Sequence, residues 1–455
     1  MPGDDAAHTP TDAARDTSSG IIRPEKPPTA SMWSLFLGLG LLMIGNGLNG
    51  AVIGVRSGNE GFGVAVTGVI MAGYFAGFLL APSLVVRMIS SVGHIRVFAG
   101  LASTASSTVL VQAVSVVPIS WTAMRFVFGF CFAGLYIVME SWLGELSTPA
   151  TRGRTLSIYM IVTMGGLGIG QYLIAVADPN GFRLFVASSV LVSMALVPVV
   201  LVTTARVPIP RAPEKVSVRQ LIGFVPTGVL GSFMSGAAAG VLLGLAAVYS
   251  SRIGLSIHRT AGFLIAPTIG ALLLQWPIGR LSDRVSRRAV IFGVVVIASA
   301  LCVVGALLPN QTPLVPLVMF GIGGMMFPLY SLVVSYTLDW TPDELTVGAA
   351  GTLIRINGSG ALLGPLITAV MMSRFGSAWF FWMMASFFGV IAVYLGYRLA
   401  SKVAMPQDQQ HPFVPFPARA TNVAIRLISA PVKATKSVGR TVVTRKHERP
   451  PSLDL

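Results

Sequence analysis

Long apolar runs alternate with short polar segments along most of this chain. About twelve of these runs are long enough to cross the hydrocarbon core of a bilayer as an α-helix, which takes roughly 20 residues. They cover approximately 33–54, 64–86, 97–117, 119–143, 156–177, 184–205, 221–249, 261–281, 289–308, 314–338, 347–372 and 379–399. The seventh run is long enough to include an interfacial piece before its span. The pattern therefore predicts an all-α integral membrane protein with twelve transmembrane helices.

The polar segments divide these runs into two sets of six. Residues 206–220 form the only long polar connector between runs, so we expect one six-helix half over 32–205 and another over 221–400. The ends form two tails, 1–31 and 401–455. The first tail is rich in Pro, Asp and Thr, which predicts disorder. It has no basic start or small-residue cleavage site, so the run from Trp33 is expected to be the first span and not a removable signal.

Composition supports a membrane protein. Hydrophobic residues make up 53% of the chain and charged residues 11%, with a mean hydropathy of +0.75. So few charges could not cover the surface of a soluble protein of this length. The net charge of +15 does not indicate a nucleic-acid partner, because the basic residues lie in loops and in the C-terminal tail.

The distribution of basic residues predicts the orientation. With both termini in the cytoplasm, the outer loops hold Arg56, Arg183, Arg252, Arg259 and Arg374. The inner loops hold Arg87, Arg96, Arg152, Arg154, Arg206, Arg211, Lys215, Arg219, Arg280, Arg284, Arg287 and Arg288. Because Lys and Arg accumulate in cytoplasmic loops, we expect both termini to be cytoplasmic in a bacterial inner membrane.

No cofactor or metal is expected. Cys131 and Cys302 fall inside apolar runs without metal-ligand spacing, and the five histidines are scattered. In the C-terminal tail, Arg426, Lys433, Lys436 and Arg440 share one side of a helical projection. That side could lie on anionic lipid, although Pro431 and Gly439 favour a solvated tail equally. We expect a monomer.

Two charged turns stand out, one in each half. The first runs from Glu145 through Arg152-Gly153-Arg154, and the second from Gly279 through Asp283-Arg284 to Arg287-Arg288. The second resembles the Gly-x-Leu-x-Asp-Arg-x-Gly-Arg-Arg pattern of the major facilitator superfamily, with Ser286 in place of the second glycine. The turn after the second run departs from it, with Pro82 and Val86 at the glycine and aspartate positions.

Further residues narrow this resemblance. Met139-Glu140-Ser141-Trp142, Arg152-Gly153-Arg154 and Gly170-Gln171 are similar to the YcaD-like branch of the superfamily, whose substrates are largely unassigned. The resemblance covers about residues 33–400. It implies the major facilitator fold, with two six-helix halves that rock about a central cavity, and secondary transport of a small-molecule substrate.

Charged residues inside the spans are costly in hydrocarbon and usually functional. Arg125 matches an Arg-x-x-x-Gly element that the resemblance links to proton coupling, and could also be a structural hydrogen-bond hub. Glu140, the one carboxylate inside a first-half span, is a proton-carrier candidate. It lies about 22 Å along the helix from Arg125, so the two cannot pair. A salt bridge from Glu140 to Arg152 or Arg154 is the structural alternative.

Other polar residues complete the candidate pathway. Arg355, followed by Asn357, should face the cavity or extend toward the inner surface. With Arg125 in the cavity, it would favour anionic or neutral polar cargo. Uncharged candidates are Asn46, Asn49, Gln171 and Gln275, each of which could instead be an interhelical hydrogen-bonding residue. The glycines of 165–170 and 358–364 permit close approach of helices.

The charged turns could act as a cytoplasmic gate or only fix topology. A carboxylate such as Asp283 can pair with an Arg across the boundary between the halves when that side closes. Glu145 and Arg152 could do likewise. We therefore expect a secondary transporter, with proton coupling as a hypothesis and export slightly favoured. The alternative is a non-transporting sensor or scaffold with the same fold. An enzyme is not expected, since no nucleophile–base pair is visible in any span.

Overall fold

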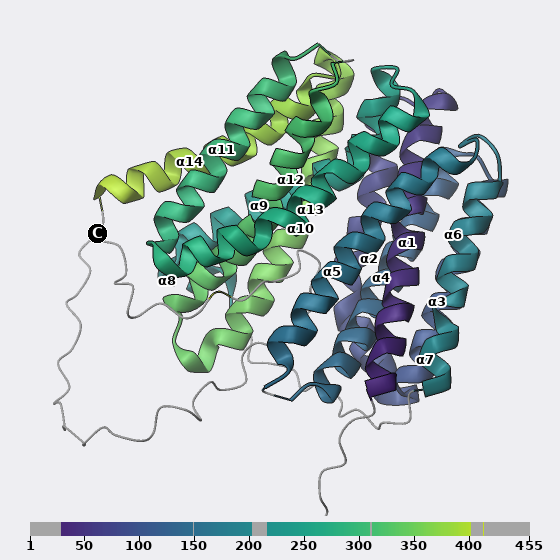
Figure 1. Ribbon diagram of the computed structural model, residues 1–455, viewed down its shortest axis with the longest axis horizontal. Coiled ribbons are helices and arrows are strands. Elements are labelled where there is room, and N and C mark those ends of the chain that lie inside the picture. Colours follow the sequence, from purple (N-terminus) through teal and green to yellow (C-terminus); the bar gives the residue numbers. More distant parts are fainter. Residues whose placement is uncertain (1–28, 149, 203–215, 310–311, 402–412, 414–455) are drawn as a thin grey trace, which may run out of the picture.

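The computed structural model describes residues 29–148, 150–202, 216–309, 312–401 and 413 of the chain, and this part is almost entirely helical (Figure 1). The helices before residue 203 are α1 (Thr29–Asn59), α2 (Val64–Val92), α3 (His94–Val114), α4 (Pro118–Leu146), α5 (Arg152–Tyr172), the 3₁₀ turn η1 (Leu173–Val176), α6 (Arg183–Met194) and α7 (Leu196–Val202). After residue 215 come α8 (Val218–Phe224), α9 (Pro226–Arg252), α10 (Ile257–Arg284), α11 (Arg287–Leu307), α12 (Val315–Asp339), η2 (Asp343–Leu345), α13 (Thr346–Phe375) and α14 (Trp379–Ser401).

Twelve of the described helical segments are long and apolar enough to span a membrane, which confirms the predicted number. The sixth span is broken between α6 and α7, at Ala195, where the chain departs from one continuous helix. The interfacial piece expected before the seventh span is α8, which Pro226 separates from α9. The structure describes little of the predicted tails 1–31 and 401–455, and it leaves out most of the connector 206–220. The proposed basic strip of the C-terminal tail lies outside the described residues.

The two halves repeat the same packing scheme. In the first half α1 packs on α5, α2 on α4 and α3 on α6; in the second, α9 packs on α13, α10 on α12 and α11 on α14. Each pair in the second half is the pair of the first half moved on by six spans. This is the arrangement of a fold built from two similar six-helix repeats.

Glycines allow the closest of these contacts. A Cβ atom at Gly170 of α5 would overlap the Ile44 carbonyl of α1, and one at Gly360 of α13 would overlap the Phe233 carbonyl of α9. The two contacts occupy equivalent places in the two halves. The expectation that both glycine-rich segments bring helices close together is confirmed at these positions.

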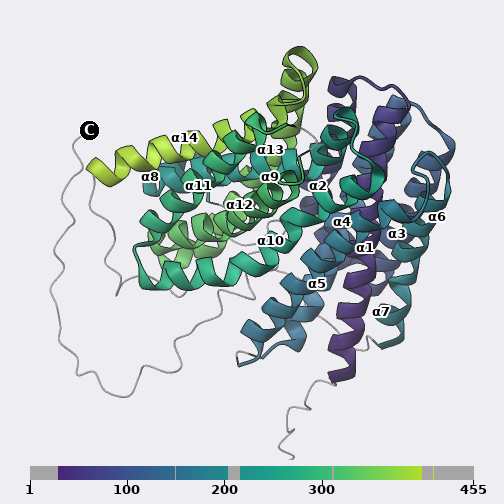
Figure 2. The ribbon, with the colours of Figure 1, turned by 45° about the horizontal axis from the view of Figure 1, so that its top comes forward.

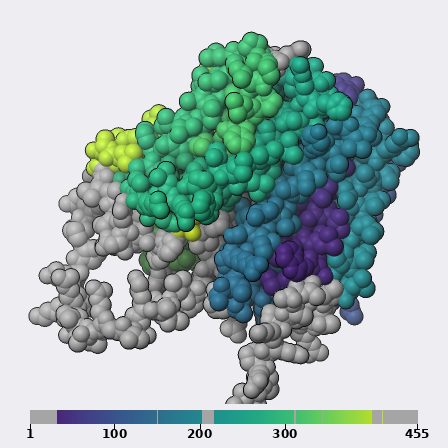
Figure 3. All heavy atoms as spheres, in the orientation of Figure 1, coloured from purple at the N-terminus to yellow at the C-terminus, as the bar shows by residue number. Residues whose placement is uncertain are grey.

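The halves meet at one end of the molecule. Gly58 of α1 lies against Ser251 of α9, Gly68 of α2 lies against Ala369 of α13, and Arg252 donates a hydrogen bond of 3.0 Å to the Phe62 carbonyl. We call this end the outer end, because the topology predicted from the basic residues would place it outside the cell. Toward the opposite, charged-loop end the two sets of helices diverge (Figures 1 and 2). In space-filling view the halves meet along an oblique boundary (Figure 3).

Candidate functional site

A small cavity lies between the two halves, on the inner side of their outer-end contacts. Helices α1, α2, α4 and α5 line it from the first half, and α9 and α10 from the second. About 20 Å³ of it is open to the centre of a water molecule, which is room for roughly one water. Its charged and amide side chains, Arg125, Asn46 and Gln171, all come from the first half, whereas the second half contributes Leu243, Ala247 and Leu264.

A relay of side chains orients Arg125, which is buried on α4. Its Nη1 donates a hydrogen bond of 2.9 Å to Oδ1 of Asn49 on α1. Asn49 in turn donates through Nδ2 to Oε1 of Gln112, also at 2.9 Å, and the indole of Trp121 donates to the Gln112 carbonyl at 3.0 Å. The guanidinium carbon lies 4.9 Å from the centre of the Tyr74 ring, within the range of cation–π attraction. Arg125 is therefore fixed at the cavity wall by three other helices.

Two amide groups of the cavity lack a hydrogen-bond partner in the described structure. They are Nδ2 of Asn46, a donor, and Oε1 of Gln171, an acceptor. Leaving such a buried group unpaired costs about 1–3 kcal/mol. The helices that carry them are held together closely, because a Cβ atom at Gly47 would overlap the Leu167 carbonyl. The wall thus presents one donor and one acceptor beside a guanidinium group, a set that suits a small polar ligand.

Glu140 lies elsewhere. It is buried within the first half, about 22 Å along α4 from Arg125 by the helical rise, and is not among the described residues that line the cavity. The Tyr159 hydroxyl of α5 donates a hydrogen bond of 2.8 Å to its Oε1. Its role as a proton carrier stays a prediction.

The other pathway candidates do not line this cavity either. Nδ2 of Asn357 donates to the Ser232 carbonyl of α9 at 3.0 Å, which is an interhelical hydrogen bond. Gln275 is buried in α10 with Nε2 unpaired among the described residues. Arg355 is exposed and donates to Thr352 Oγ1 at 3.0 Å. Of the two arginines only Arg125 lines this small cavity, and a role for Arg355 in the transport pathway stays a prediction.

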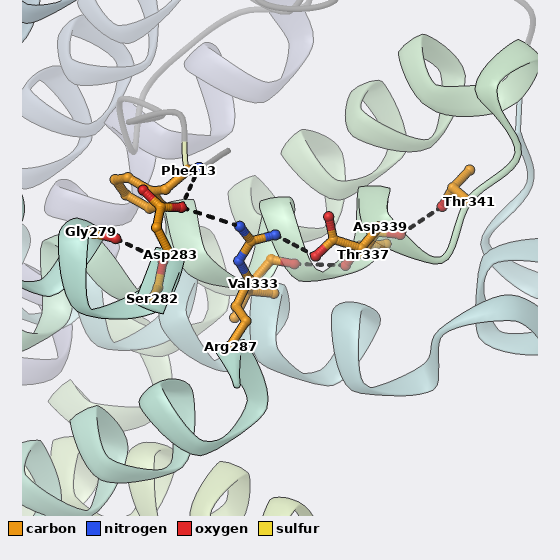
Figure 4. Close-up of polar contacts among 9 residues, drawn as sticks. All are labelled: Gly279, Ser282, Asp283, Arg287, Val333, Thr337, Asp339, Thr341 and Phe413. Carbon is orange, nitrogen blue, oxygen red and sulfur yellow. Dashed lines mark hydrogen bonds and ion pairs between the residues drawn. The ribbon is translucent and has the colours of Figure 1, made fainter. Parts of the chain in front are cut away.

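The charged turn of the second half forms a compact network (Figure 4). Arg287, at the start of α11, pairs with Asp339 at the end of α12. Arg287 also lies 3.9 Å from Asp283 on α10. The backbone N–H of Phe413 donates to Asp283 Oδ1 at 2.7 Å, and the Phe413 ring lies against Gly279. The described partners of Asp283 thus come from the second half and the C-terminal segment, and the predicted pair with a first-half arginine is not formed here.

The remaining candidates of these turns are spread between the halves. Arg288 is buried and donates to the Arg398 carbonyl and the Tyr336 hydroxyl, both at 3.3 Å, which joins α11 to α14 and α12. Arg284 lies exposed at the end of α10. In the first half Glu145, Gly153 and Arg154 are exposed, and Arg152 is half-buried. No ion pair is described between Glu145 and Arg152, so their gating role also stays a prediction.

Asp339, Gln112 and Tyr74 are important in this structure and were not singled out from the sequence. Asp339 had a usable signal, since an acidic residue directly follows the apolar run 314–338. Gln112 and Tyr74 had little, because a lone amide or tyrosine in a span is common and its partners lie on other helices. Their contacts depend on how α2, α3 and α4 pack.

Comparison with known proteins agrees with this architecture. Residues 228–442 match the family model described as Major Facilitator Superfamily. In sequence and in fold, the chain is similar to transporters of the major facilitator superfamily. An uncharacterized transporter of this type from Yersinia pestis (strain Pestoides F) is 26% identical over 351 residues, covering 76% of this chain and 88% of the relative. YcaD from Escherichia coli O6:K15:H31 (strain 536 / UPEC), also uncharacterized, is 27% identical over 84% of this chain and 99% of its own.

Solved structures of transporters share the fold. The nucleoside transporter NupG has a TM-score of 0.64 at 12% identity, covering 82% of this chain and 100% of its own. A bacterial homologue of the lysosomal transporter Spinster, inward-facing and unoccupied, has a TM-score of 0.60 at 14% identity, covering 88% and 97%. The chain therefore resembles multi-pass membrane transporters in sequence, in fold and in its twelve candidate spans.

Proposed function

We propose that this transporter moves a small polar solute across a bacterial cytoplasmic membrane by alternating access. The observation that carries this proposal is the cavity at the meeting of the halves, where Arg125 lies beside an unpaired donor of Asn46 and an unpaired acceptor of Gln171. The protein would act as a monomer with both termini in the cytoplasm. In that orientation the structure is closed at the outer end and corresponds to an inward-facing state.

The charge of the cavity supports a class of substrate. The described lining has a guanidinium group and no carboxylate, so an organic cation would meet unfavourable electrostatics. An anionic or neutral polar solute would instead accept hydrogen bonds from Arg125 and Asn46 and donate to Gln171. Since the second half contributes apolar residues, the solute would contact the first half through polar groups and the second half through an apolar part.

Proton coupling is proposed through Glu140. A buried carboxyl group that accepts a hydrogen bond from Tyr159 can exist in a protonated and an ionised form whose balance changes when α4 and α5 move. Its position outside the cavity means that coupling would act through these helices and not by direct contact with substrate. As the direction of transport, we propose export in preference to import.

The first test is a growth array of bacterial cells that overproduce the transporter, compared with cells producing Arg125→Ala at the same membrane abundance. Altered tolerance to particular compounds, lost in the variant, is expected; resistance would indicate export and sensitisation import. Arg374→Ala, an exposed arginine at the outer end of α13, is the control and should behave as wild type. Compounds that act equally on Arg125→Ala cells would contradict the assigned site.

A sensor or scaffold is the second candidate function, and the unpaired amides argue against it only indirectly. It predicts no flux of any compound from the array in proteoliposomes, and tolerance of change at Arg125.

For coupling, a compound whose flux follows a pH gradient should lose that dependence in Glu140→Gln while its binding persists. Retained dependence in this variant would move the coupling group elsewhere.

A further inference from the structure

An apolar groove lies on the second half. It runs between α8, α9, α13 and α14 and has a volume of about 550 Å³, which falls in the range of about 300–1,000 Å³ typical of ligand pockets. Val218 and Ile222 form its wall on α8, Leu230 and Phe233 on α9, and Ile356 on α13. Few polar atoms face it, so an apolar chain suits it.

The face of α13 that borders the groove is directed to the membrane. Ser359 lines the groove, and Leu363, Ile367 and Val370 farther along α13 are exposed on the same side of the helix. Gly360 and Gly364 lie farther round the helix and pack on α9. The groove therefore opens toward lipid and not toward the cavity between the halves.

Arg355 lies at the charged-loop end of this groove. It is one helical turn before Ser359, whose hydroxyl donates to the Arg355 carbonyl at 2.8 Å. Its Nη2 donates to Thr352 Oγ1 at 3.0 Å, and Thr352 donates to the Val216 carbonyl at 2.6 Å. The guanidinium group is therefore directed toward the start of α8, at the level where the topology places lipid headgroups.

An arginine on a lipid-facing surface is costly unless it reaches an anionic group. Arg355 is exposed, and no ion pair is described for it. Arg219 adds a second exposed positive charge on α8, next to Val218 of the groove wall. The apolar groove suits the acyl chain of an anionic phospholipid, and the two positive charges of Arg355 and Arg219 suit its headgroup.

We propose that this groove is a binding site for one anionic phospholipid of the cytoplasmic leaflet. An acyl chain fills the groove between α9 and α13, and the headgroup phosphate accepts hydrogen bonds from Arg355. Arg219 strengthens the preference for a net negative headgroup over a zwitterionic one. The site is separate from the cavity at Arg125 and does not depend on which solute is transported.

Native mass spectrometry of the purified full-length protein tests this site. Phosphatidylglycerol and phosphatidylcholine with the same acyl chains are added, and the lipid retained per protein is measured. We expect phosphatidylglycerol to be retained in preference, with about tenfold weaker binding or more in Arg355→Gln, the loss expected for a hydrogen bond to a charged group. Arg355→Lys should keep part of the preference, since it keeps the charge. Arg374→Gln, on the same helix at the outer end, should bind as wild type.

A second variant tests the groove itself. Ser359→Trp places a large side chain in the groove and leaves Arg355 in place, so it should lower retention of both lipids while the cavity ligand still binds. Equal retention of the two lipids by wild type would overturn the proposal. So would an unchanged preference in Arg355→Gln, or a dimer that forms in place of lipid binding and is disrupted by Ser359→Trp.

Discussion

At the scale of single residues, the position of Arg125 depends on side chains that do not themselves line the cavity. Asn49 holds the guanidinium, and Gln112 holds Asn49. Because both ends of the Asn49 amide are used, the residue cannot rotate without loss of a hydrogen bond. The orientation of the Arg125 guanidinium group therefore depends on how α1, α3 and α4 pack together.

Asn49→Ala should weaken binding of the transported compound by about tenfold or more, because a hydrogen bond to a charged group contributes about 1.5–3 kcal/mol. Affinity measured by calorimetry on the purified protein, with a compound from the growth array, checks this. Asn59→Ala removes an exposed amide at the end of the same helix, which pairs with Asn180, and should leave affinity unchanged. Wild-type affinity in Asn49→Ala would mean that Arg125 needs no relay.

The pair of Arg287 and Asp339 makes a prediction about stability. Both side chains are almost fully buried, at 1% and 2% exposure, whereas the Asp283 side chain is 42% exposed. Asp339→Ala leaves a buried positive charge without this partner and should destabilise the protein by about 3–5 kcal/mol. Asp283→Ala removes an exposed carboxylate and should have a far smaller effect. Thermal unfolding of the purified variants measures the difference, and equal midpoints would contradict this assignment.

At the scale of the elements, close packing of α1 on α5 depends on glycine. Gly170→Val should separate these helices and lower the amount of folded protein in the membrane, because the added side chain would overlap the Ile44 carbonyl. Gly165→Val, on the same helix, meets no atom within 4 Å of its Cβ and should be tolerated. Membrane abundance and the elution profile in detergent check both variants. Equal behaviour of the two would show that α5 can shift without cost.

Hydropathy was sufficient to predict the spans and the interfacial helix α8, because a membrane helix must be apolar over its whole crossing. It could not locate the ends, since helices continue into polar sequence where side chains pair locally. Arg56, for example, lies in the last turn of α1 and pairs with Glu60 at 3.0 Å. The break of the sixth span at Ala195 had a signal in Pro198, which cannot donate a hydrogen bond to the Met194 carbonyl four residues earlier and whose ring crowds that carbonyl.

The candidate site was predictable in part. Arg125, Asn46 and Gln171 could be found because polar groups in spans are rare and costly, and the cavity contains all three. The same reasoning also selected Arg355 and Asn357, which do not line the cavity: Arg355 donates to Thr352 of its own helix, and Asn357 donates to the Ser232 carbonyl of α9. A sequence shows that a residue is polar within a span, but the side of the helix it faces depends on neighbours far away in the chain.

At the scale of the whole molecule, this structure is closed at the outer end and its halves diverge at the other. Transport by alternating access requires the outer contacts to open.

A Cβ atom at Gly58 would lie 3.3 Å from Ser251 Cβ, close to the separation of about 3.5–4.5 Å found in disulfides. Gly58→Cys with Ser251→Cys should therefore cross-link on mild oxidation, while Cys131 and Cys302 remain buried and reduced. A mass decrease of two hydrogen atoms, whose electrons pass to the added oxidant, and loss of thiol labelling measure this. Failure to cross-link would mean that the outer end is open most of the time.

The measurement that tests the central claim most directly is flux in proteoliposomes of a compound identified by the growth array, using this cysteine pair. We predict flux in the reduced protein, loss of flux on oxidation and recovery on reduction, with no flux through Arg125→Ala under either condition. Flux that persists when the outer end is cross-linked, or that does not need Arg125, would contradict alternating access through this cavity.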